Sequence, residues 1–102
     1  MKKIINKIFN DDCFNILKKI PNQSVDLLFV DPPYNLQLKN KLTRPNQTTV
    51  NGVNDYWDKF NNFKQYDEFT YKWLKESKRI LKKNGSLWVI GSYHNIYRVG
   101  KM

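Results

Sequence analysis

The sequence predicts an α/β fold, because short apolar segments typical of strands alternate with segments of helical periodicity. Two segments carry this interpretation: VDLLFV at residues 25–30 and SLWVIGS at residues 86–92 are apolar along most of their length. Strands of a parallel sheet that helices cover on both faces have this composition. The predicted order is strand, helix, strand, long loop, helix, strand and a final helix.

The first half of the chain is predicted to form a strand–helix–strand unit. Residues 4–9 (IINKIF) fit a short strand, and Asp11 or Asp12 is expected to cap the helix that follows. The Pro-Asn pair at residues 21–22 is expected to end that helix. Its apolar residues recur at the spacing of one helical face: Cys13, Ile16, Leu17 and Ile20. With the strand at 25–30, this order matches the βαβ unit of parallel sheets.

The second half begins with a long segment, residues 35–65, in which no firm periodicity is present. Loops of this length are uncommon inside compact domains and are usually functional or disordered. A helix is predicted from Tyr66 to Lys83, with the Asn-Gly pair at residues 84–85 as its stop. A last helix is predicted from Tyr93. Doubly wound domains usually need roughly 150 residues or more, so we expect these 102 residues to be an incomplete part of a larger domain.

Composition restricts the function classes. The net charge of +9 and the pI near 9.7 fit a polyanionic partner such as nucleic acid, although a Lys- and Asn-rich composition from an AT-rich genome explains them equally well. The single cysteine excludes an internal disulfide framework, and no residue cluster predicts a metal site. No apolar run approaches the length of a membrane span, so a soluble cytoplasmic protein is expected.

The segment DPPY, residues 31–34, directly follows the predicted buried strand at 25–30. Ligands of open α/β sheets bind at the carboxyl ends of the strands, where this turn would lie. The two prolines restrict the backbone and donate no hydrogen bond, so the turn offers acceptors: the Asp31 carboxylate and the carbonyls of Asp31 and Pro32. Beside them, the ring of Tyr34 offers a flat face. Such a site fits a planar ligand with an NH2 group, such as a flipped nucleobase, although a plain strand-ending turn has about even odds on the tetrapeptide alone.

A longer stretch, VDLLFVDPPYNLQL, resembles the adenine-N6 DNA methyltransferases whose DPPY motif lies near the N-terminus. The segments NDDC, RPNQTTVNGVNDYWDKF and YDEFTYKWLKESKRILKKNGSLWVIGSYHNIYRVG are similar to the corresponding stretches of the cell-cycle-regulated GANTC methyltransferases and their restriction-system relatives. The resemblance covers essentially the whole chain. It implies a Rossmann-like sheet, S-adenosylmethionine as the methyl donor, and double-stranded DNA with a flipped target adenine as the substrate.

The resemblance also implies roles for particular residues. Asp31 and the Pro32 carbonyl would accept hydrogen bonds from the amine of the target base, within the turn that Pro33 and Tyr34 complete, and Tyr34 would stack on the base. Asp12 and Cys13 would lie near the adenine ring of the cofactor. From the residues alone, a helix cap at Asp12 and a small buried side chain at Cys13 are slightly favoured.

The loop at residues 35–65 carries the candidate DNA-binding residues, which are Lys39, Lys41 and Arg44. They could meet phosphates or, for Arg44, a base edge. For each lysine alone, a solvated loop charge is the preferred interpretation.

The chain departs from the family in lacking the glycine-rich cofactor motif and the target-recognition region. We therefore expect a missing C-terminal part or a complementing chain, and a possible homodimer of the complete enzyme. A non-enzymatic or vestigial nucleic-acid-binding fragment stays open as an alternative. Methylation of cytosine N4 is a second alternative, which Asp31 disfavours because those relatives more often carry serine there.

Overall fold

The computed structural model describes residues 4–35, 42–50 and 56–102, and it has the α/β class that the sequence predicts. The elements in chain order are helix α1 (Cys13–Leu17), strands β1 (Val25–Val30), β2 (Leu42–Thr43) and β3 (Thr49–Val50), a 3-10 helix η1 (Tyr56–Asp58), helix α2 (Phe63–Ile80), strand β4 (Leu81–Val89) and helix α3 (Ile96–Lys101).

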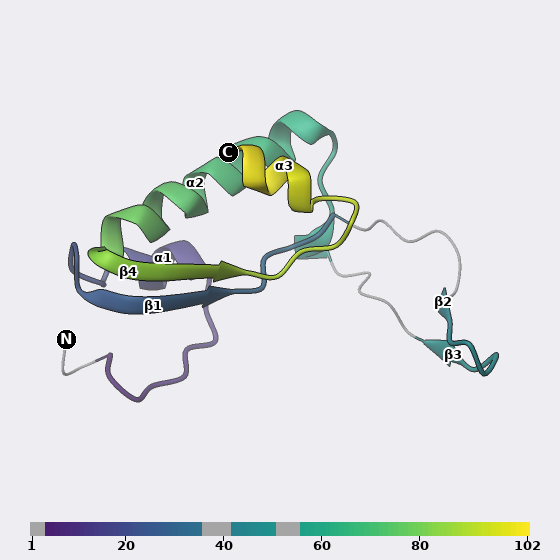
Figure 1. The fold of residues 1–102 in the computed structure, drawn as a ribbon, viewed down its shortest axis with the longest axis horizontal. Coiled ribbons are helices and arrows are strands. Elements are labelled where there is room, and N and C mark those ends of the chain that lie inside the picture. The colour runs from purple at the N-terminus through teal and green to yellow at the C-terminus, as the bar shows by residue number, and fades with distance from the viewer. Residues whose placement is uncertain (1–3, 36–41, 51–55) are drawn as a thin grey trace.

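Strands β1 and β4 form a two-stranded parallel sheet, with Leu28 opposite Leu87, Phe29 opposite Trp88 and Val30 opposite Val89. Parallel neighbours need a crossover connection, and the long helix α2 supplies it. Figure 1 shows α2 running along one face of the sheet, with α3 beside its N-terminal half. Helices α1 and α3 both contact α2, so α2 is the element on which the domain is assembled.

Helix α2 buries one stripe along its length. The Asn62 side chain caps it by accepting a hydrogen bond from the Gln65 amide (2.9 Å). Its buried residues recur every three or four positions: Tyr66, Thr70, Trp73, Ser77 and Ile80. Tyr66, Trp73 and Val99 of α3 form the core cluster, against which Phe60, Phe69 and Val30 pack.

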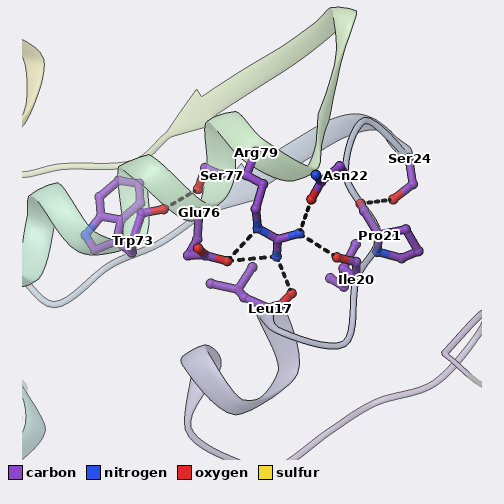
Figure 2. Close-up of polar contacts among 9 residues, drawn as sticks. All are labelled: Leu17, Ile20, Pro21, Asn22, Ser24, Trp73, Glu76, Ser77 and Arg79. Carbon is purple, nitrogen blue, oxygen red and sulfur yellow. Dashed lines mark hydrogen bonds and ion pairs between the residues drawn. The ribbon is translucent and has the colours of Figure 1, made fainter.

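Arg79 ties the end of α1 to α2 (Figure 2). Its guanidinium donates to the carbonyls of Leu17 (2.8 Å) and Ile20 (2.9 Å) and to the side chain of Asn22 (2.8 Å), and it pairs with Glu76 (2.7 Å). The carbonyls at a helix end have no partner inside the helix, so an arginine fork can satisfy them from outside.

Several predicted boundaries are wrong. Residues 4–9 form no strand, and α2 ends at Ile80 instead of Lys83, because Leu81 already has extended backbone angles and begins β4. The Asn-Gly pair at residues 84–85 lies inside β4, where the register shifts between Val25 and Leu27 of the partner strand. At Gly85 an added Cβ would lie 3.1 Å from the Val25 carbonyl oxygen, so this glycine marks a close approach of two strands. Helix α3 starts at Ile96, three residues after the predicted Tyr93.

The sheet is covered on one face only, within the part of the chain that the structure describes. Leu28, Val30 and Val89 are half-buried on the side of α2, whereas Phe29 and Trp88 are 62% and 63% exposed on the other side. The prediction of strands buried on both faces is therefore wrong for these residues. The apolar pattern is present, but the described helices supply a cover for one face.

The segment predicted as a structureless loop contains local structure. Strands β2 and β3 form a short antiparallel hairpin, which lies apart from the sheet and helices in Figure 1. Its turn is closed by Arg44, whose amide donates to the Thr48 carbonyl (2.8 Å), and Gln47 has a positive φ of 65°. The 3-10 helix η1 follows and lies close to the end of β1. Among the described residues, no helix is long and apolar enough to cross a membrane.

Candidate active site

The DPPY turn lies at the carboxyl end of β1, as the sequence predicts. Asp31 is exposed, Pro32 is buried, and the hydroxyl of Tyr34 donates a hydrogen bond to Oδ1 of Asp31. This hydrogen bond to the carboxylate, followed by burial and by the charge of Asp31, raises the pKa of Tyr34 to about 12. Among the described residues, none donates a hydrogen bond to Oδ2 of Asp31 or to the Pro32 carbonyl, so neither acceptor has a described partner.

Residues distant in sequence hold the backbone of this turn. The Asp58 carboxylate of η1 accepts hydrogen bonds from the amides of Tyr34 (2.6 Å) and Asn35 (3.0 Å). The Tyr66 hydroxyl of α2 donates to the Pro33 carbonyl (3.0 Å) and accepts from the side-chain amide of Asn95 (2.7 Å). Sequence reasoning missed these three contributions, because no local signal links residues 58, 66 and 95 to the turn.

A cavity of about 310 Å³ opens beside the turn, between β1, α1 and α2. Its walls are mainly apolar and aromatic, and its rim carries the Asp31 carboxylate. Its lining includes Cys13, Leu28, Phe29, Asp31, Phe69 and Trp73. The indole Nε1 of Trp73 is buried without a hydrogen-bond partner among the described residues. Buried N–H groups are normally paired, so an unpartnered indole donor is an exception among the buried groups of this domain.

The two candidate cofactor residues have different surroundings. The Asp12 side chain accepts from the Phe14 amide (2.8 Å) and caps α1, as the residues alone favoured. Cys13 is exposed instead of buried, and it lines the same cavity as Asp31, Pro32 and Pro33. Partial burial, with a smaller contribution from the charge of Asp12, raises the pKa of the Cys13 thiol. The structure thus brings one of the two predicted cofactor residues to the predicted catalytic turn.

The structure describes one of the three candidate DNA-binding residues, Arg44. Arg44 is exposed at the turn of the β2–β3 hairpin. Lys39 and Lys41 lie outside the described residues. Over the described ranges, no group of three or more His, Cys, Asp or Glu side chains has a geometry that could hold a metal ion.

Comparisons with known proteins identify the family of this chain. The family model described as DNA methylase matches residues 25–102, which include the DPPY turn, α2, β4 and α3. The Type II methyltransferase M.HinfI of Haemophilus influenzae is 57% identical over 96 residues, covering 94% of this chain and 27% of the relative. The Type II methyltransferase M2.DpnII of Streptococcus pneumoniae is 38% identical over 93 residues, covering 91% of this chain and 34% of the relative.

This chain therefore spans between a quarter and about a third of the length of these relatives. The match of the family model extends over more than half of the chain, and it begins at the first residue of β1. The resemblance inferred from the sequence is confirmed, and this chain belongs to the DNA methylase family.

Proposed function

We propose that the complete protein methylates N6 of adenine in double-stranded DNA with S-adenosylmethionine, and that this chain supplies the turn that holds the target amine. The observation that carries the proposal is the pair of open acceptors, Oδ2 of Asp31 and the Pro32 carbonyl, at the carboxyl end of a parallel strand. The similarity of this chain to two Type II methyltransferases supports it. In this proposal β1 and β4 are part of a larger, Rossmann-like sheet.

The walls of the cavity fit part of the methyl donor. Leu28, Phe69 and Trp73 offer apolar and aromatic surfaces for a flat heterocycle. The Asp31 carboxylate at the rim would attract a sulfonium cation. The volume of about 310 Å³ is at the lower end for ligand cavities, so residues beyond this chain would complete the site. When bound, S-adenosylmethionine supplies an electrophilic methyl group.

The chemistry of this chain is the activation of a poor nucleophile. The lone pair of an exocyclic amine is delocalised into the base ring. If its two N–H groups donate to Asp31 and to the Pro32 carbonyl, the nitrogen keeps its lone pair outside the ring plane, directed at the methyl carbon. With S-adenosylmethionine bound, its methyl group would pass to the nitrogen as the carbon–sulfur bond breaks, and Asp31 would accept the surplus proton of the nitrogen. Tyr34 would stack on the flipped base, a contact worth about 1–3 kcal/mol.

The test is the substitution Asp31→Ala in the complete protein. We expect methyl transfer to fall by about 10²–10³, because a fixed electrostatic partner of the reacting group is lost, while cofactor affinity stays close to that of the wild type. Asp26→Ala is the matched control: Asp26 lies on β1, the strand that leads to Asp31, and pairs with Lys82 (2.8 Å) at the exposed surface. Transfer of a radiolabelled methyl group measures the rate.

Mass spectrometry of the digested DNA identifies the product. N6-methyladenine supports the proposal, whereas N4-methylcytosine would assign the same turn to the other exocyclic amine. Wild-type protein that binds DNA but transfers no methyl group would favour the non-enzymatic alternative. An Asp31→Ala protein with the turnover of the Asp26→Ala control would contradict the role of Asp31.

A further inference from the structure

A buried polar network makes hydrogen bonds to the backbone of the DPPY turn at atoms other than Oδ2 of Asp31 and the Pro32 carbonyl. Its members Asp58, Tyr66 and Asn95 are only 2–3% exposed, and they come from η1, α2 and the segment that follows β4. Buried polar groups that are fully hydrogen-bonded make a site rigid and specify one arrangement. None of these residues faces the cavity beside Asp31.

The network has a defined hydrogen-bond direction. The side-chain oxygen of Asn95 accepts from the Ser92 amide (2.7 Å) and hydroxyl (3.1 Å), so the NH2 group of Asn95 is turned toward Tyr66. The Tyr66 hydroxyl accepts that hydrogen bond (2.7 Å), and its own proton therefore points to the Pro33 carbonyl (3.0 Å). One of the two proline carbonyls of the turn is thereby occupied.

Asp58 fixes the exit of the turn. Its buried Oδ1 accepts from two consecutive amides, those of Tyr34 and Asn35, and Asn35 has a positive φ of 56°. The side chain of Asn35 in turn accepts from the Phe60 amide (3.1 Å). Hydrogen bonds to a carboxylate are stronger than those between neutral groups, so they can hold a residue in the sparsely populated left-handed region.

We propose that Tyr66 and Asp58 are positioning residues for methyl transfer, an inference that rests on the proposed function. Tyr66 occupies the Pro33 carbonyl, so that the amine of the base finds its acceptors at Asp31 and Pro32 alone. Asp58 fixes the backbone that carries the Tyr34 ring. Neither residue touches the base. Their contribution is the alignment of the attacking nitrogen, which a displacement of about 1 Å would disturb by about 100-fold in rate.

The first test is Tyr66→Phe in the complete protein, which removes one oxygen and keeps the packing of the ring. We expect kcat to fall by about tenfold to 100-fold, with the KM for DNA and the dissociation constant of S-adenosylmethionine close to the wild-type values. Tyr71→Phe is the matched control, because Tyr71 lies on the same helix with an exposed ring and no described hydrogen bond. A purely structural role would lower the melting temperature and leave kcat of the folded enzyme unchanged, and that result would overturn the proposal.

The second test does not depend on activity. Hydrogen exchange read at single residues should show the amides of Tyr34 and Asn35 protected in the wild type, less so in Asp58→Asn, and unprotected in Asp58→Ala. Asp58→Asn keeps an oxygen acceptor but loses its charge, so an intermediate rate is expected. Equal exchange in all three proteins would refute the role of Asp58. The two Asp58 variants could lose amide protection as expected while the wild-type protein transfers no methyl group. That combination would show that Asp58 holds the turn and that the proposed function is wrong.

Discussion

Replacement of Arg79 by methionine tests how α1 is kept against the cavity. Arg79→Met retains the aliphatic stem and removes the guanidinium, which leaves the Leu17 and Ile20 carbonyls and the Asn22 side chain without this donor (Figure 2). Helix α1 has only five residues, too few for stability in isolation. We therefore expect the segment from α1 to Ser24 to open locally while the rest of the domain stays folded.

The size of the effect follows from the contacts. A hydrogen bond to a charged group contributes about 1.5–3 kcal/mol when buried, but the Arg79 side chain is 29% exposed, and water replaces part of what is lost. The contact with Glu76 is a partly exposed ion pair and adds at most about 1 kcal/mol. We expect the free energy of local opening to fall by about 2–4 kcal/mol, near the upper end for single substitutions.

Amide exchange in the complete protein measures this free energy. The amides of Ile20 and Gln23 are suitable reporters, because they donate to the carbonyls of Leu17 (3.0 Å) and Arg79 (3.0 Å). A loss of 2–4 kcal/mol corresponds to exchange roughly 30- to 700-fold faster, limited by the rate of an unprotected amide. Since α1 forms one wall of the cavity, Arg79→Met should lower cofactor affinity as well. Arg79→Lys should keep only part of the amide protection and of the cofactor affinity, because one ammonium cannot span three acceptors.

Arg98→Met is the matched control. Arg98 makes two hydrogen bonds to the Asp67 carboxylate (2.6 and 2.9 Å) and stacks over the Phe63 ring at 4.4 Å, but it is more exposed and satisfies no helix-end carbonyl. Its loss should cost about 0.2–1 kcal/mol. Equal effects of the two substitutions on the reporter amides would refute the reasoning, because the hold on α1 would then not depend on Arg79.

Two further predictions concern Tyr34 and Arg44. Because the folded-state pKa of Tyr34 is raised from 10.0 to about 12, its hydrogen bond to Asp31 should stabilise the fold fully below pH 10, and this stabilisation should be lost as the pH rises through 12. In an absorbance titration, Tyr34→Phe should remove this late ionisation step and Asp31→Asn should move it to lower pH. A step that Asp31→Asn leaves unshifted would contradict the pairing of Tyr34 with Asp31. Arg44→Ala should weaken DNA binding with little effect on cofactor binding. A lost base contact would reduce discrimination between target and near-target duplexes by about 1–3 kcal/mol, whereas a lost phosphate contact would lower the affinity for all sequences and flatten its salt dependence. If neither discrimination nor affinity changes, Arg44 is not a DNA-binding residue.

Local signals in the sequence predicted the local features of the fold. The bounds of β1 agree with the structure, Asp12 caps α1, and the DPPY turn lies at the end of β1. Each of these depends on residues within a few positions of one another, such as a capping carboxylate or a proline that restricts its neighbour. The family and the place of the candidate catalytic residues could therefore be inferred from one sequence.

Features that depend on distant partners could not be predicted in this way. The Asn-Gly pair at residues 84–85 has the composition of a helix stop, but it lies inside β4, where Gly85 closely approaches the Val25 carbonyl of the partner strand, sixty residues away in the sequence. Asp58 looks like one acid in a basic, aromatic stretch, and its two amide partners lie 24 and 23 residues before it. The strand predicted at residues 4–9 failed for the same reason, since apolar residues form a strand only where a neighbouring strand can pair with them.

The rigidity of the DPPY turn thus has two sources that act on different atoms. The prolines restrict φ at Pro32 and Pro33, but they leave open which carbonyls face a ligand. That choice depends on Tyr66, which occupies the Pro33 carbonyl, and on Asp58, which accepts hydrogen bonds from the amides of Tyr34 and Asn35. In a DPPY segment with the prolines alone, the backbone would be restricted, but the carbonyls that face a ligand would not be determined. An enzyme that activates a weak amine needs both the restricted backbone and the fixed choice of carbonyls, because two acceptors must meet two N–H groups at once. The free-energy cost of ordering these two acceptors is then met during folding instead of at the moment of reaction.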